Sequence, residues 1–268
     1  MKRIMIMVFV LAIVFGCSHK NSNEIIGSGT IEAVEVMVSS KVSGNVLRFF
    51  VDEGSSVKQG DTIAEIDGTI YELQLKQAKS ALAMAQANFK VIEDNYQSTL
   101  KLYKQGTATQ KQKEELTTRY QVAMAQRDQA QATVNLAEQM LSYCWITAPV
   151  SGIITHKLVE TGELAGPGTG IVTISQMDSV KLTIYITEQE LGLVKIGQSA
   201  DVKIDSYPER VFPGKVIYIS PEAEFTPKNI QTRDERVKLV YGVKIEIPNP
   251  DLILKASMPA DAVIKIKD

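Results

Sequence analysis

The segment VSGNVLRFFVDEGSSVKQGDTIAEID, residues 42–67, has a counterpart later in the chain, VSGIITHKLVETGELAGPGTGIVTIS, residues 150–175. The two copies align without gaps, and the identical pairs are Val42/Val150, Ser43/Ser151, Gly44/Gly152, Val51/Val159, Gly54/Gly162, Gly60/Gly168, Ile63/Ile171 and Ile66/Ile174. Each copy predicts short strands separated by glycine turns. Gly44 and Gly152 are expected at a turn of unusual φ, and Gly54, Gly60, Gly162 and Gly168 around a second turn. Two such copies predict a small β-sandwich whose halves are related by a pseudo-twofold axis.

The residues between the copies have the periodicity of two helices. Apolar positions alternate steps of three and four, which is typical of a coiled-coil seam. Polar residues such as Lys76, Gln86 and Lys90 flank the seam, which argues against helices packed flat on a sheet as an ordinary core. A turn at residues 105–108 predicts an antiparallel hairpin, roughly 50 Å long at 1.5 Å per residue. The seam residues are Leu75, Ala78, Leu82, Ala85, Phe89, Ile92, Tyr96, Thr99 and Tyr103, then Leu116, Tyr120, Ala123, Arg127, Ala130, Val134, Ala137 and Leu141, with Arg127 as the one clear break.

The last third of the chain predicts a small β-barrel. Strands are expected within residues 180–186, 200–205, 214–219, 237–247 and 260–266. A strand borrowed from Thr30 to Ser39 would close the barrel and remove its open edges. A short helix is expected from Glu188 to Lys195 after a Thr187 cap, and the charged stretch from Glu222 to Arg236 is interpreted as a solvated or partner-facing loop.

The N-terminus has the pattern of a targeting segment. Lys2 and Arg3 precede an apolar run from Ile4 to Phe15, too short for a membrane-spanning helix, which needs about 20 apolar residues. This pattern predicts a secretory signal peptide, with an uncleaved anchor or a buried strand as the alternatives. Its end, Val14-Phe15-Gly16-Cys17, resembles a bacterial lipobox, in which Cys17 becomes the lipidated first residue. The other cysteine, Cys144, stands in apolar surroundings and is interpreted as a core residue.

Composition excludes several classes of function. The chain has 29 Lys and Arg against 31 Asp and Glu, so it lacks the excess of basic residues that is typical of nucleic-acid-binding proteins. A serine hydrolase would have to use His19 or His156, and two cysteines with two histidines make a four-ligand zinc site hard to build. The methionines outside the signal peptide are dispersed, which argues against a copper site. We therefore expect no enzyme activity, catalytic residue or metal site.

The two copies also have a family resemblance. Each resembles one half of a biotinyl or lipoyl carrier domain, but residues 68–149 replace the tight hairpin that would hold a modified lysine. No biotin or lipoate is therefore expected. The predicted fold is mainly β with a long α-helical coiled-coil hairpin. Its parts are a signal peptide (1–16), a lipidated linker (17–29), a barrel strand (30–39), the lipoyl-like halves (40–67 and 146–176), the coiled-coil hairpin (68–145) and the β-barrel (177–268).

The whole layout resembles the periplasmic adaptors, or membrane fusion proteins, of the hemolysin D family. The resemblance implies a homo-oligomeric ring, expected to be a hexamer, that bridges an inner-membrane transporter to a TolC-like outer-membrane channel in a Gram-negative periplasm. Residues 224–232 and 235–240 look like adaptors of ABC exporters. The alternatives are an adaptor of an RND or MFS transporter and a free-standing periplasmic binding lipoprotein, although the strand pattern offers no two-lobed cleft.

The resemblance also implies contact residues, with departures. At the hairpin tip TolC-linked adaptors carry Arg, Leu and Ser, and the matching positions here are Ser98, Leu102 and Thr109. Ser98 lacks the fork of donors of a guanidinium, for which Lys101 or Lys104 would substitute only as a point charge. A further membrane-proximal domain is expected to be missing or rudimentary. Inner-membrane attachment follows from the resemblance, whereas Ser18 in place of Asp leans toward the outer membrane.

Overall fold

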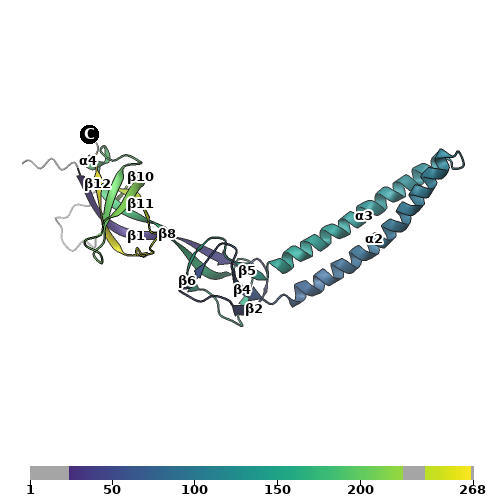
Figure 1. Cartoon of the computed structure of the whole chain (residues 1–268), viewed down its shortest axis with the longest axis horizontal. Coiled ribbons are helices and arrows are strands. Elements are labelled where there is room, and N and C mark those ends of the chain that lie inside the picture. Colours follow the sequence, from purple (N-terminus) through teal and green to yellow (C-terminus); the bar gives the residue numbers. More distant parts are fainter. Residues whose placement is uncertain (1–23, 226–238, 267–268) are drawn as a thin grey trace, which may run out of the picture. The chain divides into compact units, whose positions relative to one another are not determined.

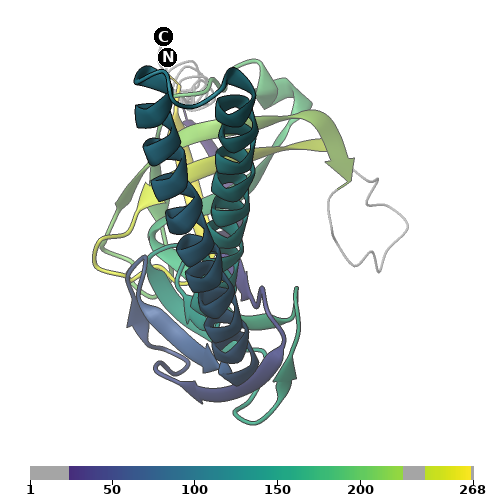
Figure 2. The same ribbon diagram turned by 90° about the vertical axis from the view of Figure 1, so that its right-hand side faces the viewer.

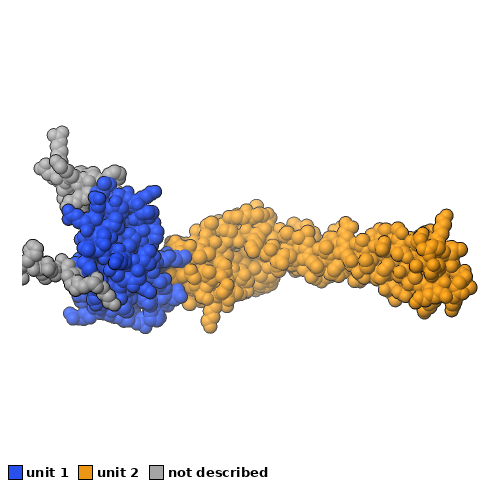
Figure 3. Space-filling view, turned by 90° about the horizontal axis from the view of Figure 1, so that it is seen from above, with its two compact units in different colours: residues 1–34, 177–268 blue, residues 35–176 orange. Residues whose placement is uncertain are grey.

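The structure, a computed structural model, describes residues 24–225 and 239–266 (Figure 1). The chain divides into two compact units, unit 1 of residues 1–34 and 177–268 and unit 2 of residues 35–176 (Figure 3). Two long strands, β1 (Glu24–Ser39) and β8 (Gly170–Thr187), contribute residues to both units. The predicted signal peptide (1–16) and the lipidation residue Cys17 lie outside the described residues.

The β-domain of unit 2 is built from strands of both sequence copies. The first copy supplies β2 (Gly44–Phe49), β3 (Ser56–Val57) and β4 (Thr62–Ile66), and the second copy supplies β6 (Gly152–Lys157), β7 (Leu164–Ala165) and the first part of β8. Together with β5 (Trp145–Thr147), these strands form one sheet of order β5-β4-β2-β7 and a second ladder β8-β6-β3.

Each copy completes the sheet of the other. Gly44 of β2 pairs with Ala165 of β7, and its counterpart Gly152 of β6 pairs with Val57 of β3. The pseudo-twofold relation predicted from the repeat is therefore present in the strand pairing. Turn hydrogen bonds repeat it, from the Gly54 amide to the Ile154 carbonyl and from the Gly162 amide to the Val46 carbonyl, each 2.8 Å long.

The glycines of the repeat serve two purposes. The backbone φ is positive at Gly54, Gly60, Gly162 and Gly168, as their predicted turn positions require. Gly44 and Gly152 do not have positive φ, so the predicted turn of unusual φ at these two residues is wrong. They are glycines because neighbouring strands pass close by. A Cβ on Gly152 would overlap the carbonyl oxygen of Ser175, and one on Gly44 would lie 2.6 Å from Cγ2 of Ile66.

The core of the β-domain draws on both copies. Cys144 belongs to it, with 2% of its surface exposed, which confirms the interpretation of this cysteine as a core residue. Burial raises the pKa of its thiol, and the negative charges of Asp67 and Glu72 add to the effect. The other buried members are Val38, Val42, Val46, Val57, Ile63, Ala64, Ile66, Ile146, Ala148, Ile154, Ala165, Ile171, Val172 and Ile174.

Two long helices occupy the insertion between the copies. They are α2 (Thr69–Lys104) and α3 (Gln110–Ser142), and they lie side by side along their length (Figures 1 and 2). Lys79 and Glu138 form an ion pair of 3.0 Å between the helices. Since residues near the start of α2 meet residues near the end of α3, the helices are antiparallel. The helical part ends at Ser142, three residues before the predicted boundary at 145, because Trp145 already belongs to β5.

Unit 1 is a closed barrel. Its strands are ordered β1-β12-β9-β10-β11-β8, and a further pairing of β8 with β1 closes the ring. Each predicted strand of the last third overlaps an observed strand, although residues 204, 205 and 266 lie outside the observed strands and residues 237–238 lie outside the described residues. Their bounds are β9 (Ser199–Lys203), β10 (Phe212–Phe225), β11 (Leu239–Pro248) and β12 (Pro259–Lys265), with β8 as given above. Most of the predicted charged loop, residues 226–236, lies outside the described residues.

The strand borrowed by the barrel begins earlier than predicted. Residues 24–30 of β1 pair with β12, so the predicted linker 17–29 is wrong over residues 24–29, and the predicted barrel strand 30–39 is displaced. Gly27 and Gly29 allow β1 to pass close to β8. A Cβ on Gly29 would overlap the carbonyl oxygen of Thr183. Ile25 and Ile31, at 3% and 1% exposure, belong to the core of the barrel.

Candidate functional site at the tip of the helical hairpin

The predicted seam is the packing surface of the hairpin. Every predicted seam residue is buried or half-buried, including Arg127, whereas Lys76, Gln86 and Lys90 are exposed. Ala78, Phe89, Ala123 and Val134 are the buried residues of the two helices. The spacing of apolar residues therefore identified the contacting faces correctly.

Arg127 does not break the packing. Its guanidinium carbon lies 4.4 Å from the centre of the Phe89 ring. A cation–π contact therefore takes the place of apolar packing at this position of the seam. The neighbouring ring of Tyr120 lies 5.5 Å from Phe89 and stacks on Tyr96 at 4.7 Å. The charged group remains partly solvated, with 32% of the side chain exposed, and pairs with Asp128.

The turn at the tip is held by backbone and side-chain hydrogen bonds. The amide and the hydroxyl of Thr107 both donate to the carbonyl oxygen of Leu102 at 3.0 Å, and Gly106 has a φ of 74°. Helix α3 then begins with a capping box. The Thr109 hydroxyl oxygen accepts from the amide of Gln112, and the Gln112 side chain accepts from the amide of Thr109 at 2.8 Å.

The three predicted contact residues have different surroundings. Leu102 is 48% exposed and lines a pocket of about 300 Å³. Thr109 is the N-cap of α3, and the Ser98 hydroxyl donates to the carbonyl of Asp94 within α2. Of the three predicted contact residues, Leu102 lines this pocket and the other two do not. Its lining residues are Thr99, Leu102, Thr107, Ala108, Gln112, Glu115, Leu116 and Arg119.

Arg119 is the residue that sequence reasoning missed. Its guanidinium forms an ion pair of 2.7 Å with Glu115, one turn earlier on α3, and it stands beside Leu102 in the pocket lining. The seam register contained a signal for it. Arg119 lies three residues after Leu116 and one before Tyr120, which are both seam residues, so it is expected at the edge of the face that meets α2. The tip therefore offers a guanidinium from α3, although Ser98 of α2 cannot supply one.

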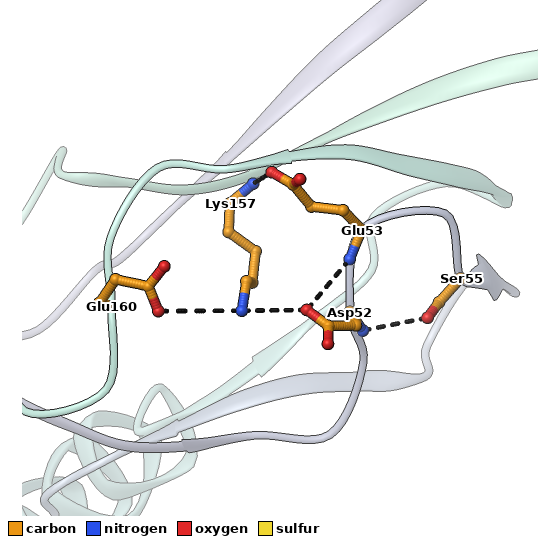
Figure 4. A network of polar contacts seen from close by, with 5 residues as sticks. All are labelled: Asp52, Glu53, Ser55, Lys157 and Glu160. Atoms are coloured by element: carbon orange, nitrogen blue, oxygen red, sulfur yellow. Dashed lines mark hydrogen bonds and ion pairs between the residues drawn. The ribbon is translucent and has the colours of Figure 1, made fainter.

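A polar network joins the two copies in the β-domain (Figure 4). The Lys157 ammonium lies 3.0 Å from the Asp52 carboxylate and 3.8 Å from Glu160, and the Lys157 amide donates to Glu53 at 2.8 Å. The hydrogen bond and charge of Lys157 lower the pKa of Asp52, and the hydrogen bond to Asp52 raises the pKa of Lys157. The network fastens a turn of the first copy to a strand of the second.

The remaining residues with chemical potential do not converge. His156, which a hydrolase would have to use, is exposed on β6. No group of three His, Cys, Asp or Glu residues is placed to hold a metal ion within the part of the chain that the structure describes. Over the same residues, no helix has both the length and the hydropathy to cross a membrane.

The two units coincide with two families of known domains. Residues 34–175 match the family model described as RND MFP, barrel-sandwich hybrid domain, and residues 179–267 match the CusB-like β-barrel domain. The chain therefore belongs to the membrane fusion protein family. Among its relatives, the UPF0194 membrane protein YbhG of Salmonella paratyphi B is 26% identical over 292 residues, which cover 90% of this chain and 88% of the relative.

Two solved structures are similar over most of the chain. MacA from Actinobacillus actinomycetemcomitans has a TM-score of 0.72 and 26% identity, and the match covers 91% of this chain and 78% of that one. A MacA-MexA chimeric protein with the α-hairpin domain of Pseudomonas aeruginosa MexA has a TM-score of 0.66 and 27% identity, with coverage of 91% and 79%. Both contain the fold described above.

Proposed function

We propose that this membrane fusion protein is the periplasmic adaptor of a tripartite export system, linking an inner-membrane transporter to a TolC-like outer-membrane channel. The observation that carries the proposal is the helical hairpin between the two sequence copies that form the β-domain, in the place where a carrier domain would hold its modified lysine. The hairpin is long, has mostly polar residues outside its seam and ends in a capped tip. These properties suit a spacer that contacts a partner at its end, without a cofactor and without catalysis.

The proposed transporter is of the ABC type. This preference rests on residues 224–232 and 235–240, whose sequence looks like that of adaptors of ABC exporters. An RND transporter is the second candidate, because both family models carry descriptions that refer to RND or CusB-like proteins. Crosslinking a C-terminally tagged chain in cells, followed by mass spectrometry, separates the two. Recovery of a permease with its ATPase supports the first, and an RND pump would replace it.

Exposed apolar side chains on the hairpin support a ring of copies. Met84 and Val91 of α2 are 73% and 60% exposed, and Val122 and Leu136 of α3 are 52% and 58% exposed. These residues stand away from the seam and would be covered if hairpins packed side by side into a sleeve. We propose a hexamer held at the membrane by lipid on Cys17, with the inner membrane as its site. Mass measurement of the detergent-purified complex tests the stoichiometry.

The channel contact can be tested at the tip without disturbing the fold. Leu102→Glu adds a charge at an exposed position, and Thr109→Asp keeps an N-cap residue at the start of α3. We expect the double variant to remain folded and to lose its crosslink to the outer-membrane channel. The matched control is Leu73→Glu, a leucine near the other end of α2 that is 62% exposed, against 48% for Leu102. An unchanged crosslink in the double variant would exclude this tip as the contact.

A further inference from the structure

A short loop of unit 1 presents two large apolar side chains to solvent. The loop, residues 192–198, follows the helix α4 (Glu188–Leu191), which ends earlier than the predicted Lys195. Leu193 and Ile196 are 47% and 68% exposed, whereas Val194 between them is 5% exposed and belongs to the core of the barrel. One residue of the loop thus anchors it while its neighbours point outward.

Internal hydrogen bonds hold the loop in this form. The Lys195 amide donates to the Gln198 side chain at 2.8 Å, and the amide group of the same side chain donates to the carbonyl of Leu193 at 3.2 Å. The Gly197 amide donates to the carbonyl of Val216 on β10 at 2.8 Å. Since the loop is already ordered, binding through Leu193 and Ile196 would cost little conformational entropy.

The loop lies at the end of the barrel where the described chain begins. Glu24 pairs with Lys265, Ile264 pairs with Ala200, and Lys215 pairs with Ser199. These pairings align residues of the four neighbouring strands β1, β12, β9 and β10 at one edge of the barrel. The loop directly precedes Ser199 and therefore stands on this rim, close to the ends of β1 and β12 (Figure 1).

The sequence before Glu24 fixes what this rim can reach. Residues 18–23 are all that separates Glu24 from Cys17, and the apolar run from Ile4 to Phe15 ends just before. Seven residue steps span at most about 25 Å when fully extended. With lipid on Cys17, as proposed above, or with the apolar run as the anchor, the rim would be held within that distance of a membrane surface.

Two lysines near the loop could meet anionic headgroups. Lys195 and Lys215 are exposed, and neither forms an ion pair with another described residue. The Lys215 side chain lies beside Gly197 of the loop. The same rim also carries Glu24, a Lys265–Asp201 ion pair of 2.6 Å and Glu246, the register partner of Lys215, and Glu188 and Glu190 of α4 precede the loop, so the charge around the loop is mixed.

We infer that loop 192–198 is a second membrane contact, which inserts Leu193 and Ile196 into the headgroup region of the bilayer that holds the N-terminal anchor. Lys195 and Lys215 would face anionic headgroups, each contributing attraction near the surface. The inference rests on the anchor of the proposed function, which brings the rim to the membrane. The inference adds that the inserted loop, and not only the N-terminal anchor, orients the barrel at the membrane.

The test uses an environment-sensitive fluorophore on the full chain. Ile196→Cys is labelled with a nitrobenzoxadiazole probe, and the protein is reconstituted with vesicles of phosphatidylglycerol and phosphatidylethanolamine. The matched control is Val211→Cys, which is 44% exposed in the wild-type chain but lies at the opposite end of the β9–β10 ladder. We expect blue-shifted emission and quenching by doxyl-labelled lipid at position 196, and neither effect at position 211.

Flotation of the same vesicles separates the possible failures. If the protein floats but the probe at position 196 behaves like the probe at position 211, the loop does not enter the membrane and the anchor stands. If the protein does not float, both the anchor and the loop contact are wrong. Retention of the quenching pattern in a second variant, Leu193→Cys, would support insertion of the whole loop.

Discussion

Single residues decide how closely the strands of this protein approach one another. Gly152 and Gly44 hold equivalent places in the two copies, and each lies against backbone or side chain of a crossing strand. Lys157 and Asp52 act at the same scale, because one ion pair joins a strand of one copy to a turn of the other. Substitution of either glycine would bring an added side-chain atom against a neighbouring strand. Substitution of Asp52 or Lys157 would remove a charge that the ion pair needs.

Gly152→Ala is expected to destabilise the β-domain by about 1–3 kcal/mol, because the added methyl group overlaps the Ser175 carbonyl and forces the strands apart. Thermal unfolding followed by circular dichroism measures the change. Gly166→Ala is the control, since a Cβ there meets only two hydroxyl oxygens at 3.9 Å. Equal losses in the two variants would show that the close approach at Gly152 does not limit stability.

The Asp52–Lys157 pair is expected to stabilise the fold in a pH-dependent way. Because the pKa of Asp52 is lowered below the ordinary value of 3.8, its contribution is present above that value and is lost as pH falls through the lowered pKa. A double-mutant cycle with Asp52→Asn and Lys157→Gln should show coupling at about pH 5 that declines toward about pH 2. Coupling that is constant over this range would contradict the assignment.

At the scale of elements, the aromatic residues of the seam hold the hairpin together more than its alanines do. Many seam residues are alanines, which bury little area, whereas Phe89, Tyr96 and Tyr120 stack across the two helices and Arg127 covers Phe89. The cluster lies between the tip and the β-domain along the hairpin. It is therefore the main fixed point that sets the register of α2 against α3.

Tyr120→Ala should destabilise the hairpin by about 2 kcal/mol or more, because it removes both ring contacts and leaves a void at a half-buried position. Hydrogen exchange of the α2 and α3 amides measures this locally. Val122→Ala, at a 52% exposed position two residues away, should change exchange within about 0.5 kcal/mol. Similar protection in the two variants would argue against a central role for the cluster.

For the whole molecule, the two units have separate buried cores. The core of unit 1 is formed mostly by residues of the barrel strands and that of unit 2 mostly by residues of the two copies, and the two cores have no residue in common. Each unit also has its own close approach of strands at glycine, which occurs at Gly29 in the barrel and at Gly44 and Gly152 in the β-domain. Stability should therefore be divisible between the units.

This division predicts localised effects of two variants. Gly29→Ala, which would place a methyl group on the Thr183 carbonyl, should increase hydrogen exchange in unit 1, and Gly152→Ala should increase it in unit 2. Mass spectrometry of exchanged peptides distinguishes the units. If either variant raised exchange equally in both, the chain would unfold as one cooperative structure.

Sequence periodicity determined a large part of this protein. The repeat predicted the paired halves of the β-domain, because strands of period two and positive-φ turns leave a local signature. The steps of three and four predicted the faces of the hairpin, since helix contacts follow from spacing along one segment. The expected contact role of Leu102 at the tip came from the family resemblance and not from this spacing.

Only the tertiary structure decided where distant segments meet. Gly29 and Gly152 are required by the carbonyls of Thr183 and Ser175, which no local pattern connects to them. Arg119 enters the tip pocket because the register of α2 against α3 brings it beside Leu102. The first barrel strand begins at Glu24 because closure needs a partner for β12, and strand pairing over such separations is set by packing of the whole barrel rather than by the residues of one strand.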